Sequence, residues 1–182
     1  MKRKTPRDLS AIAHHEAGHA VAAWQLGLKF RRVTIKSEGD TLGHVLNARG
    51  PKWLNDVGFI LSVRARQHAE RYIVYGMAGQ IAEENFRGRR PKPWAHADDD
   101  RSAIVLAMRA IPGSQRTVNA FLGYCFENAR DIVASQWTQI TAVAAALLAQ
   151  DTLTYEETLE VIAPGAKEMQ RRRKVNRVKL EP

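Results

Sequence analysis

The chain has 182 residues, 45% hydrophobic and 26% charged, proportions that are ordinary for one soluble globular domain. A single cysteine excludes an internal disulfide framework, and the longest apolar run, residues 142–149, is far shorter than the ~20 residues that cross a membrane. The net charge is +9, but eight of these nine charges lie in residues 1–8 and 167–182. Basic ends on a nearly neutral body favour solvated tails over a nucleic-acid surface.

The first predicted element is a helix that begins near Thr5 and ends at Gly27. Thr5, Pro6 and Asp8 form a capping sequence, and apolar residues then recur at helical spacing as far as Trp24. Gly18 lies inside this helix, where glycine costs about 1 kcal/mol relative to alanine. We therefore expect another element to approach the helix closely at this position.

This helix contains the motif His-Glu-x-x-His, formed by His15, Glu16 and His19. Residues four apart lie on one face of a helix, so both imidazoles can bind one cation while Glu16 lies beside it. Two neutral histidines and a carboxylate that accepts a proton from zinc-bound water are typical of zinc hydrolases. The alternative is a core helix that happens to contain two histidines.

A β-hairpin is predicted next, with strands at Arg32–Lys36 and Thr41–Asn47 joined by a turn. A strand beside the metal helix of a zinc peptidase commonly holds an extended substrate by main-chain pairing. His44 lies on the second strand and is more simply interpreted as a half-exposed residue without a role.

Helices are predicted for most of the remaining chain. A short one at residues 55–63 precedes a longer one from Arg64 to Phe86, which ends at Gly88 and contains Gly76 and Gly79 for close packing. One long helix or two are predicted for residues 115–149, with a buried stripe that includes Cys125 and Leu148. A capping box at Thr154–Glu157 begins a last helix. We expect one domain over residues 1–165 and a basic tail over residues 166–182.

Three acids, Asp98, Asp99 and Asp100, open the helix predicted to end at Ala110. Acids at a helix N-terminus can be simple caps, but three in a row exceed what a cap needs. A two-histidine zinc site needs a third ligand while one position stays open. A carboxylate from this cluster would complete such a site.

With these residues assembled, the chain resembles the peptidase domain of the FtsH family of ATP-dependent zinc metalloproteases. Residues 13–20 are similar to the metal motif of that family, residues 33–43 to its edge hairpin, and residues 147–153 to its closing segment. Residues 78–84 resemble its Ala-Gly-Arg-x-Ala-Glu-Glu segment, with Gln80 in place of the usual arginine. The resemblance implies a mainly α fold with a small β-hairpin beside the motif helix.

The resemblance also implies a third zinc ligand. The family uses an Asp that opens a helix, and aligning its following Ala with Ala103 places the ligand at Asp99, with Asp98 next in preference. Asp100 and Ile104 depart from the family pattern. A Glu ligand from Glu83 or Glu84 is the alternative, and His96 is a further candidate.

We therefore expect a zinc-dependent endopeptidase in which Glu16 is the general base and His15, His19 and Asp99 bind Zn²⁺. The alternative is a noncatalytic zinc-containing module that binds a protein or nucleic acid through its basic tails. Family members carry an ATPase module and membrane segments; this sequence contains no Gly-x-x-x-x-Gly-Lys-Ser/Thr phosphate loop and no signal peptide pattern, so a freestanding, cytoplasmic peptidase domain is expected. Its substrate would be a polypeptide, whereas a separate ATPase partner and homo-oligomerisation stay open.

Overall fold

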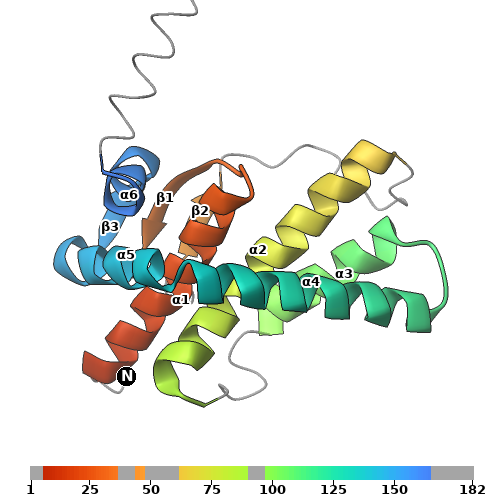
Figure 1. Cartoon of the computed structure of the whole chain (residues 1–182), viewed down its shortest axis with the longest axis horizontal. Helices are drawn as coiled ribbons and strands as arrows, with labels where there is room; N and C mark the ends of the chain where they lie inside the picture. The colour runs from red at the N-terminus through yellow and green to blue at the C-terminus, as the bar shows by residue number, and fades with distance from the viewer. Residues whose placement is uncertain (1–5, 37–43, 48–61, 90–96, 165–182) are drawn as a thin grey trace, which may run out of the picture.

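The computed structural model describes residues 6–36, 44–47, 62–89 and 97–164, and these residues form six helices and three short strands (Figure 1). The helices are α1 (Pro6–Gln25), α2 (Val63–Arg87), α3 (Ala97–Ala110), α4 (Gln115–Ser135), α5 (Trp137–Gln150) and α6 (Tyr155–Ile162). The strands are β1 (Phe30–Thr34), β2 (His44–Asn47) and β3 (Thr152–Thr154). The expected mainly α fold with a small sheet is thus confirmed. The basic tail and the expected helix at 55–63 lie outside the described residues, save Ser62 and Val63 where α2 begins.

The core forms where α1 crosses α2 and α5. Nearly all side chains of α1 from Ala11 to Ala23 are buried, because α2, α4 and α5 surround that helix. The α1 helix ends as predicted at Gly27, which adopts a left-handed φ of 68°. Gly88 ends α2 in the same way, with φ 68° and an amide that donates to the carbonyl of Glu84.

The sheet is antiparallel, with strand order β2-β1-β3, and it packs beside α1. Val33 of β1 lies opposite Val45 of β2 and Leu153 of β3. The strand β3 was not predicted, because three residues give too short a pattern. Thr34 holds it in place: its Oγ1 donates to the carbonyl of Asp151 at 3.1 Å and lies 2.7 Å from Thr152 Oγ1. The strand β2 forms one edge of this sheet.

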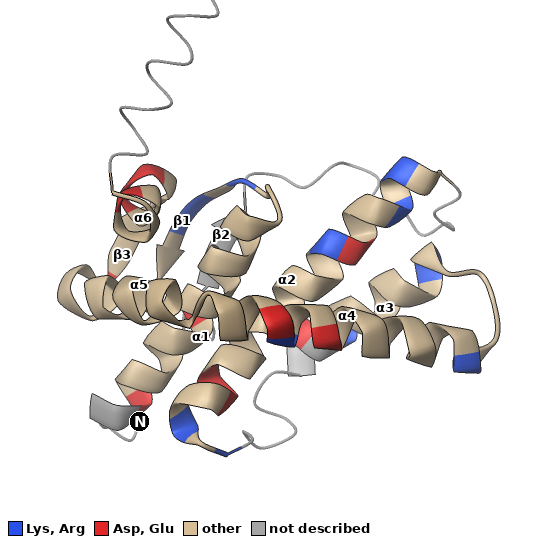
Figure 2. Ribbon diagram, in the orientation of Figure 1, with Lys and Arg blue, Asp and Glu red and all other residues tan. Residues whose placement is uncertain are grey.

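Residues 115–149 form two helices, which meet at Gln136 with a bend of 75°. Cys125 is fully buried as expected, but the expected burial of Leu148 is wrong, since 43% of that residue is exposed. Leu147 takes the inward position, and its neighbour Leu148 is turned about 100° around the helix axis. Figure 2 shows that α5 carries no charged side chain, whereas α2, α4 and α6 carry several.

Among the described residues no single helix is long and apolar enough to cross a membrane, and only the bent pair α4 and α5 meets that test together.

Candidate metal centre

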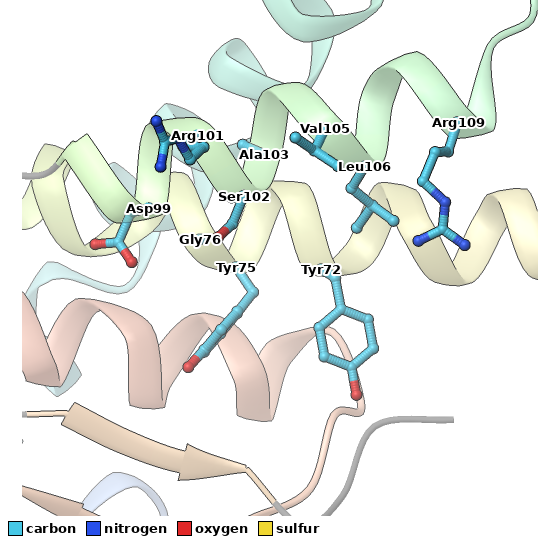
Figure 3. Close-up of a pocket in the computed structure, with 10 residues that line it drawn as sticks. All are labelled: Tyr72, Tyr75, Gly76, Asp99, Arg101, Ser102, Ala103, Val105, Leu106 and Arg109. Atoms are coloured by element: carbon cyan, nitrogen blue, oxygen red, sulfur yellow. The ribbon is translucent and has the colours of Figure 1, made fainter. Parts of the chain in front are cut away.

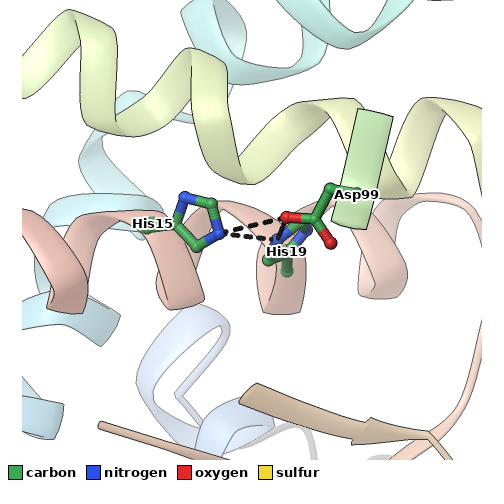
Figure 4. A group of neighbouring side chains, drawn as sticks. All are labelled: His15, His19 and Asp99. Carbon is green, nitrogen blue, oxygen red and sulfur yellow. Dashed lines mark hydrogen bonds and ion pairs between the residues drawn. The ribbon is translucent and has the colours of Figure 1, made fainter. Parts of the chain in front are cut away.

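The structure brings His15, His19 and Asp99 together at the crossing of α1 and the first turn of α3 (Figure 4). The two Nε2 atoms lie 3.1 Å apart, and Asp99 Oδ2 lies 3.5 Å from that of His15 and 3.6 Å from that of His19. Donors bound to one tetrahedral zinc at about 2.0–2.1 Å are separated by about 3.3 Å. The three donor atoms therefore form a triangle of the size that one face of a zinc tetrahedron requires.

A second contact at Nδ1 directs each histidine ring toward this triangle. His19 Nδ1 donates to the carbonyl of Tyr75 at 2.9 Å, which leaves the Nε2 lone pair of the neutral ring free for a metal. His15 Nδ1 lies 3.5 Å from Glu83 Oε2, and this carboxylate favours the same tautomer. Such outer contacts fix ring orientation and make the ligating nitrogen more basic.

Glu83 is in turn held by Arg87, one helical turn further along α2. Arg87 Nε donates to Glu83 Oε1 at 2.6 Å, and its Nη1 lies 3.7 Å from Asp8 Oδ1 on α1. Glu83 is one of the alternative third ligands that the sequence offers. The structure instead places it on the far side of the His15 ring from Asp99. The i, i+4 spacing of Glu83 and Arg87 on one helix is the sequence signal for this pair.

Charges around the triangle favour a cation at its centre. Burial lowers the pKa of His15, but hydrogen bonds with Asp99 and Glu83 and the charge of Glu16 outweigh this and raise it to about 10. For Asp99, burial raises the pKa, but contacts with His15 and His19 outweigh it and hold the pKa well below its usual value. The metal-free protein therefore keeps a proton among these donors, where a metal ion would otherwise supply the positive charge.

His14, the other histidine of the motif segment, has different surroundings. Its ring stacks on Phe86 at a centroid distance of 4.1 Å, and its Nδ1 donates to the carbonyl of Ser10 at 2.7 Å. Burial lowers the pKa of His14, which favours a neutral, packed ring. His14 is thus a structural residue of the α1–α2 interface.

Two glycines allow α1 and α2 to approach closely beneath the triangle. A Cβ on Gly18 would lie 2.6 Å from Ala82 Cβ and 2.7 Å from the carbonyl oxygen of Ala78, so the expected close approach is confirmed. A Cβ on Gly79 would overlap the His19 ring. Gly76 was expected to have the same role, but a Cβ there would meet no atom within 4 Å.

The structure describes only some of the other candidate residues that the sequence suggests. Glu16 is 4% exposed on the same helix as the two histidines. Glu84 is half-buried on α2, one position beyond Glu83. His96 and the side chains of Asp98 and Asp100 lie outside the described residues. The roles of His15, His19 and Asp99 as ligands and of Glu16 as base stay predictions.

Comparison with curated proteins finds distantly similar proteases. The ATP-dependent zinc metalloprotease FtsH of Mycoplasma mobile is 28% identical over 109 residues, which cover 59% of this chain and 14% of that protein. The ATP-dependent zinc metalloprotease YME1 homolog of Schistosoma mansoni is 28% identical over 83% of this chain. The mitochondrial inner membrane m-AAA protease component yta12 of Schizosaccharomyces pombe is 21% identical over 88%.

The chain is distantly similar to ATP-dependent zinc metalloproteases. It spans only 14% to 26% of the length of these relatives. No family model matches the chain. The similarity supports the resemblance to the FtsH family and a metallopeptidase kind of function, whereas it does not test whether this domain acts alone.

Proposed function

We propose that this chain is a zinc-dependent metallopeptidase that cleaves peptide bonds in unfolded or flexible polypeptides. The observation that carries the proposal is the triangle of His15, His19 and Asp99 donors, whose sides of 3.1, 3.5 and 3.6 Å suit one zinc ion. The distant zinc metalloprotease relatives support the same class of reaction.

When bound, zinc would supply a Lewis acid for the scissile carbonyl and lower the pKa of the attacking water to about 7. His15, His19 and Asp99 hold the ion, and Glu83 and the Tyr75 carbonyl orient the two imidazoles. Glu16 accepts the proton of the attacking water and passes it to the amine of the leaving chain. Its burial favours proton transfer, because little bulk water competes for the carboxylate.

An extended substrate segment would pair with the outer edge of β2. This strand forms one edge of the sheet and lies against α1, which carries the proposed metal ligands. Main-chain pairing at an edge needs a chain without its own secondary structure. We therefore infer that the substrates are unfolded or flexible polypeptides.

The test is cleavage of an unfolded protein such as casein by the zinc-loaded chain. We expect cleavage that a chelator stops and added zinc restores. A destabilised and a stable form of one substrate, each with and without ATP, show the substrate class: the destabilised form is cleaved faster, and ATP has no effect. Zinc binding without any cleavage would favour the noncatalytic binding module instead.

A further inference from the structure

A cavity of about 480 Å³ begins at Asp99 and runs between α2 and α3 (Figure 3). Its α3 wall includes Ser102, Leu106 and Arg109, which follow Asp99 at helical spacing on one face. Its α2 wall includes Tyr72, Tyr75 and Gly76. Gly76 lines the cavity, and a Cβ there would meet nothing within 4 Å.

The length of the cavity suits a segment of chain better than a single side chain. Figure 3 shows Asp99 at one end of the lining and Arg109 at the other. The two residues are ten positions apart on α3, which corresponds to about 15 Å along the helix axis. An extended polypeptide covers this distance with about four to five residues.

Charged residues lie at both ends of the lining. Asp99 is the acid of the lining, and its charge is engaged by His15 and His19. Its two bases are Arg101, which is exposed two positions after Asp99, and Arg109 at the other end. Arg109 is half-buried at the far end, beside Tyr72 and Leu106, where partial removal from water strengthens a contact with an anion.

We infer that this groove binds an extended polypeptide carrying a carboxylate about four to five residues from the bond to be cleaved, with Arg109 selecting that carboxylate. The inference rests on the proposed metallopeptidase function and names its substrate class. The carboxylate is that of an acidic side chain or of a chain terminus. Tyr72, Tyr75 and Leu106 supply apolar contacts for the intervening residues.

Binding is measured by fluorescence anisotropy with labelled peptides and the zinc-loaded Glu16→Gln chain, which holds the peptides without turnover. Each peptide carries Glu or its neutral counterpart Gln at one position, and a second set compares a free carboxyl terminus with an amide. At one position we expect the charged form to bind about tenfold more tightly, as one charge-assisted hydrogen bond provides. The set in which this preference is seen identifies the source of the carboxylate.

Arg109→Gln should remove this preference, and Arg109→Lys should keep part of it. Arg116→Gln, which removes an exposed arginine of α4 outside the cavity, is the matched control and should keep it fully. Equal binding of charged and neutral peptides at every position would overturn the inference, as would a preference that survives Arg109→Gln.

Wild-type cleavage of the same peptides separates this inference from the proposed function. Discrimination in binding without any cleavage would contradict the peptidase proposal and leave the groove assignment in place. Cleavage with no dependence on the carboxylate in rate or binding would contradict the groove assignment alone.

Discussion

The triangle of donors combines two regions of the molecule that differ in burial. The packed α1–α2 pair holds the two histidines, and α3 supplies Asp99. His15 and His19 are 9% and 5% exposed, and the neighbouring α2 contacts the second nitrogen of each ring. The side chain of Asp99 is 40% exposed. The α3 helix that carries it leaves three apolar residues, Ile104, Val105 and Met108, 44–50% exposed. The histidine pair is therefore built into the core, whereas the carboxylate is added from a helix that packs less completely.

This difference indicates how changes in the two regions should act. A substitution in the α1–α2 pair alters the fold and the metal centre together, because the same packing that buries the core orients the rings. A substitution at Asp99 alters the metal centre with little effect on the fold.

The largest expected effect is the loss of zinc when a donor is removed. His19→Ala and Asp99→Ala should each lose stoichiometric zinc in metal analysis, whereas Asp131→Ala, an exposed acid of α4, should keep it. In chelator, His19→Ala should also lower the free energy of unfolding by about 1–3 kcal/mol, since it removes a buried ring and its hydrogen bond to the Tyr75 carbonyl. Asp99→Ala should lower it by a smaller amount, because the lost contacts with His15 and His19 belong to a carboxylate whose side chain is 40% exposed.

Denaturant unfolding of the metal-free variants measures this contrast. Full zinc retention by Asp99→Ala would move the third donor elsewhere, and Asp98, the next in preference from the sequence, would be the first candidate. Equal destabilisation by the two substitutions would contradict the distinction between the core pair and the added carboxylate.

The next effect concerns the glycine at the helix crossing. Gly18→Ala should lower the free energy of unfolding by about 2 kcal/mol or more, because its Cβ meets the Ala78 carbonyl and Ala82 and forces α1 and α2 apart. Gly76→Ala, within α2 but facing open space, should raise it by about 0.5–1 kcal/mol through helix propensity. Thermal or urea unfolding of both variants tests the pair. Stabilisation by Gly18→Ala would show that the helices do not pack as closely as described.

The smallest expected effect is that of the outer contact to His15. Glu83→Gln should weaken zinc binding about tenfold, because it loses the charge that orients His15 and pairs with Arg87. Glu84→Gln, at the next position of α2, is the control and should change zinc affinity little. Competition with a chromogenic chelator measures both, and equal affinities would remove Glu83 from the account.

The sequence was sufficient to predict features that depend on local spacing. His15 and His19 share a face because they are four residues apart, and the capping box at Thr154 is present, with Thr154 Oγ1 accepting from the Glu157 amide. Bringing Asp99 to these histidines depends on how α3 packs on α2, which no local pattern encodes. Its selection from the acidic cluster rested on the family resemblance.

Features set by tertiary contacts were missed. The strand β3 exists because Asp151 and Thr152 pair with Thr34 more than a hundred residues earlier in the chain. The Tyr75 carbonyl cannot be recognised in advance as the partner of His19, because every residue carries such a carbonyl. The groove that ends at Arg109 likewise depends on how α2 and α3 pack, because both helices line it.

The central claim is that Glu16 acts as a proton acceptor beside a zinc ion held by other residues. The most direct measurement is the zinc content, the unfolding transition and the casein cleavage rate of Glu16→Gln, made beside the wild type on the same preparation. We predict one zinc per chain and an unchanged cooperative unfolding transition in both proteins, with cleavage lost in the variant alone. Casein cleavage at the wild-type rate by a fully zinc-loaded Glu16→Gln protein would contradict this role of Glu16.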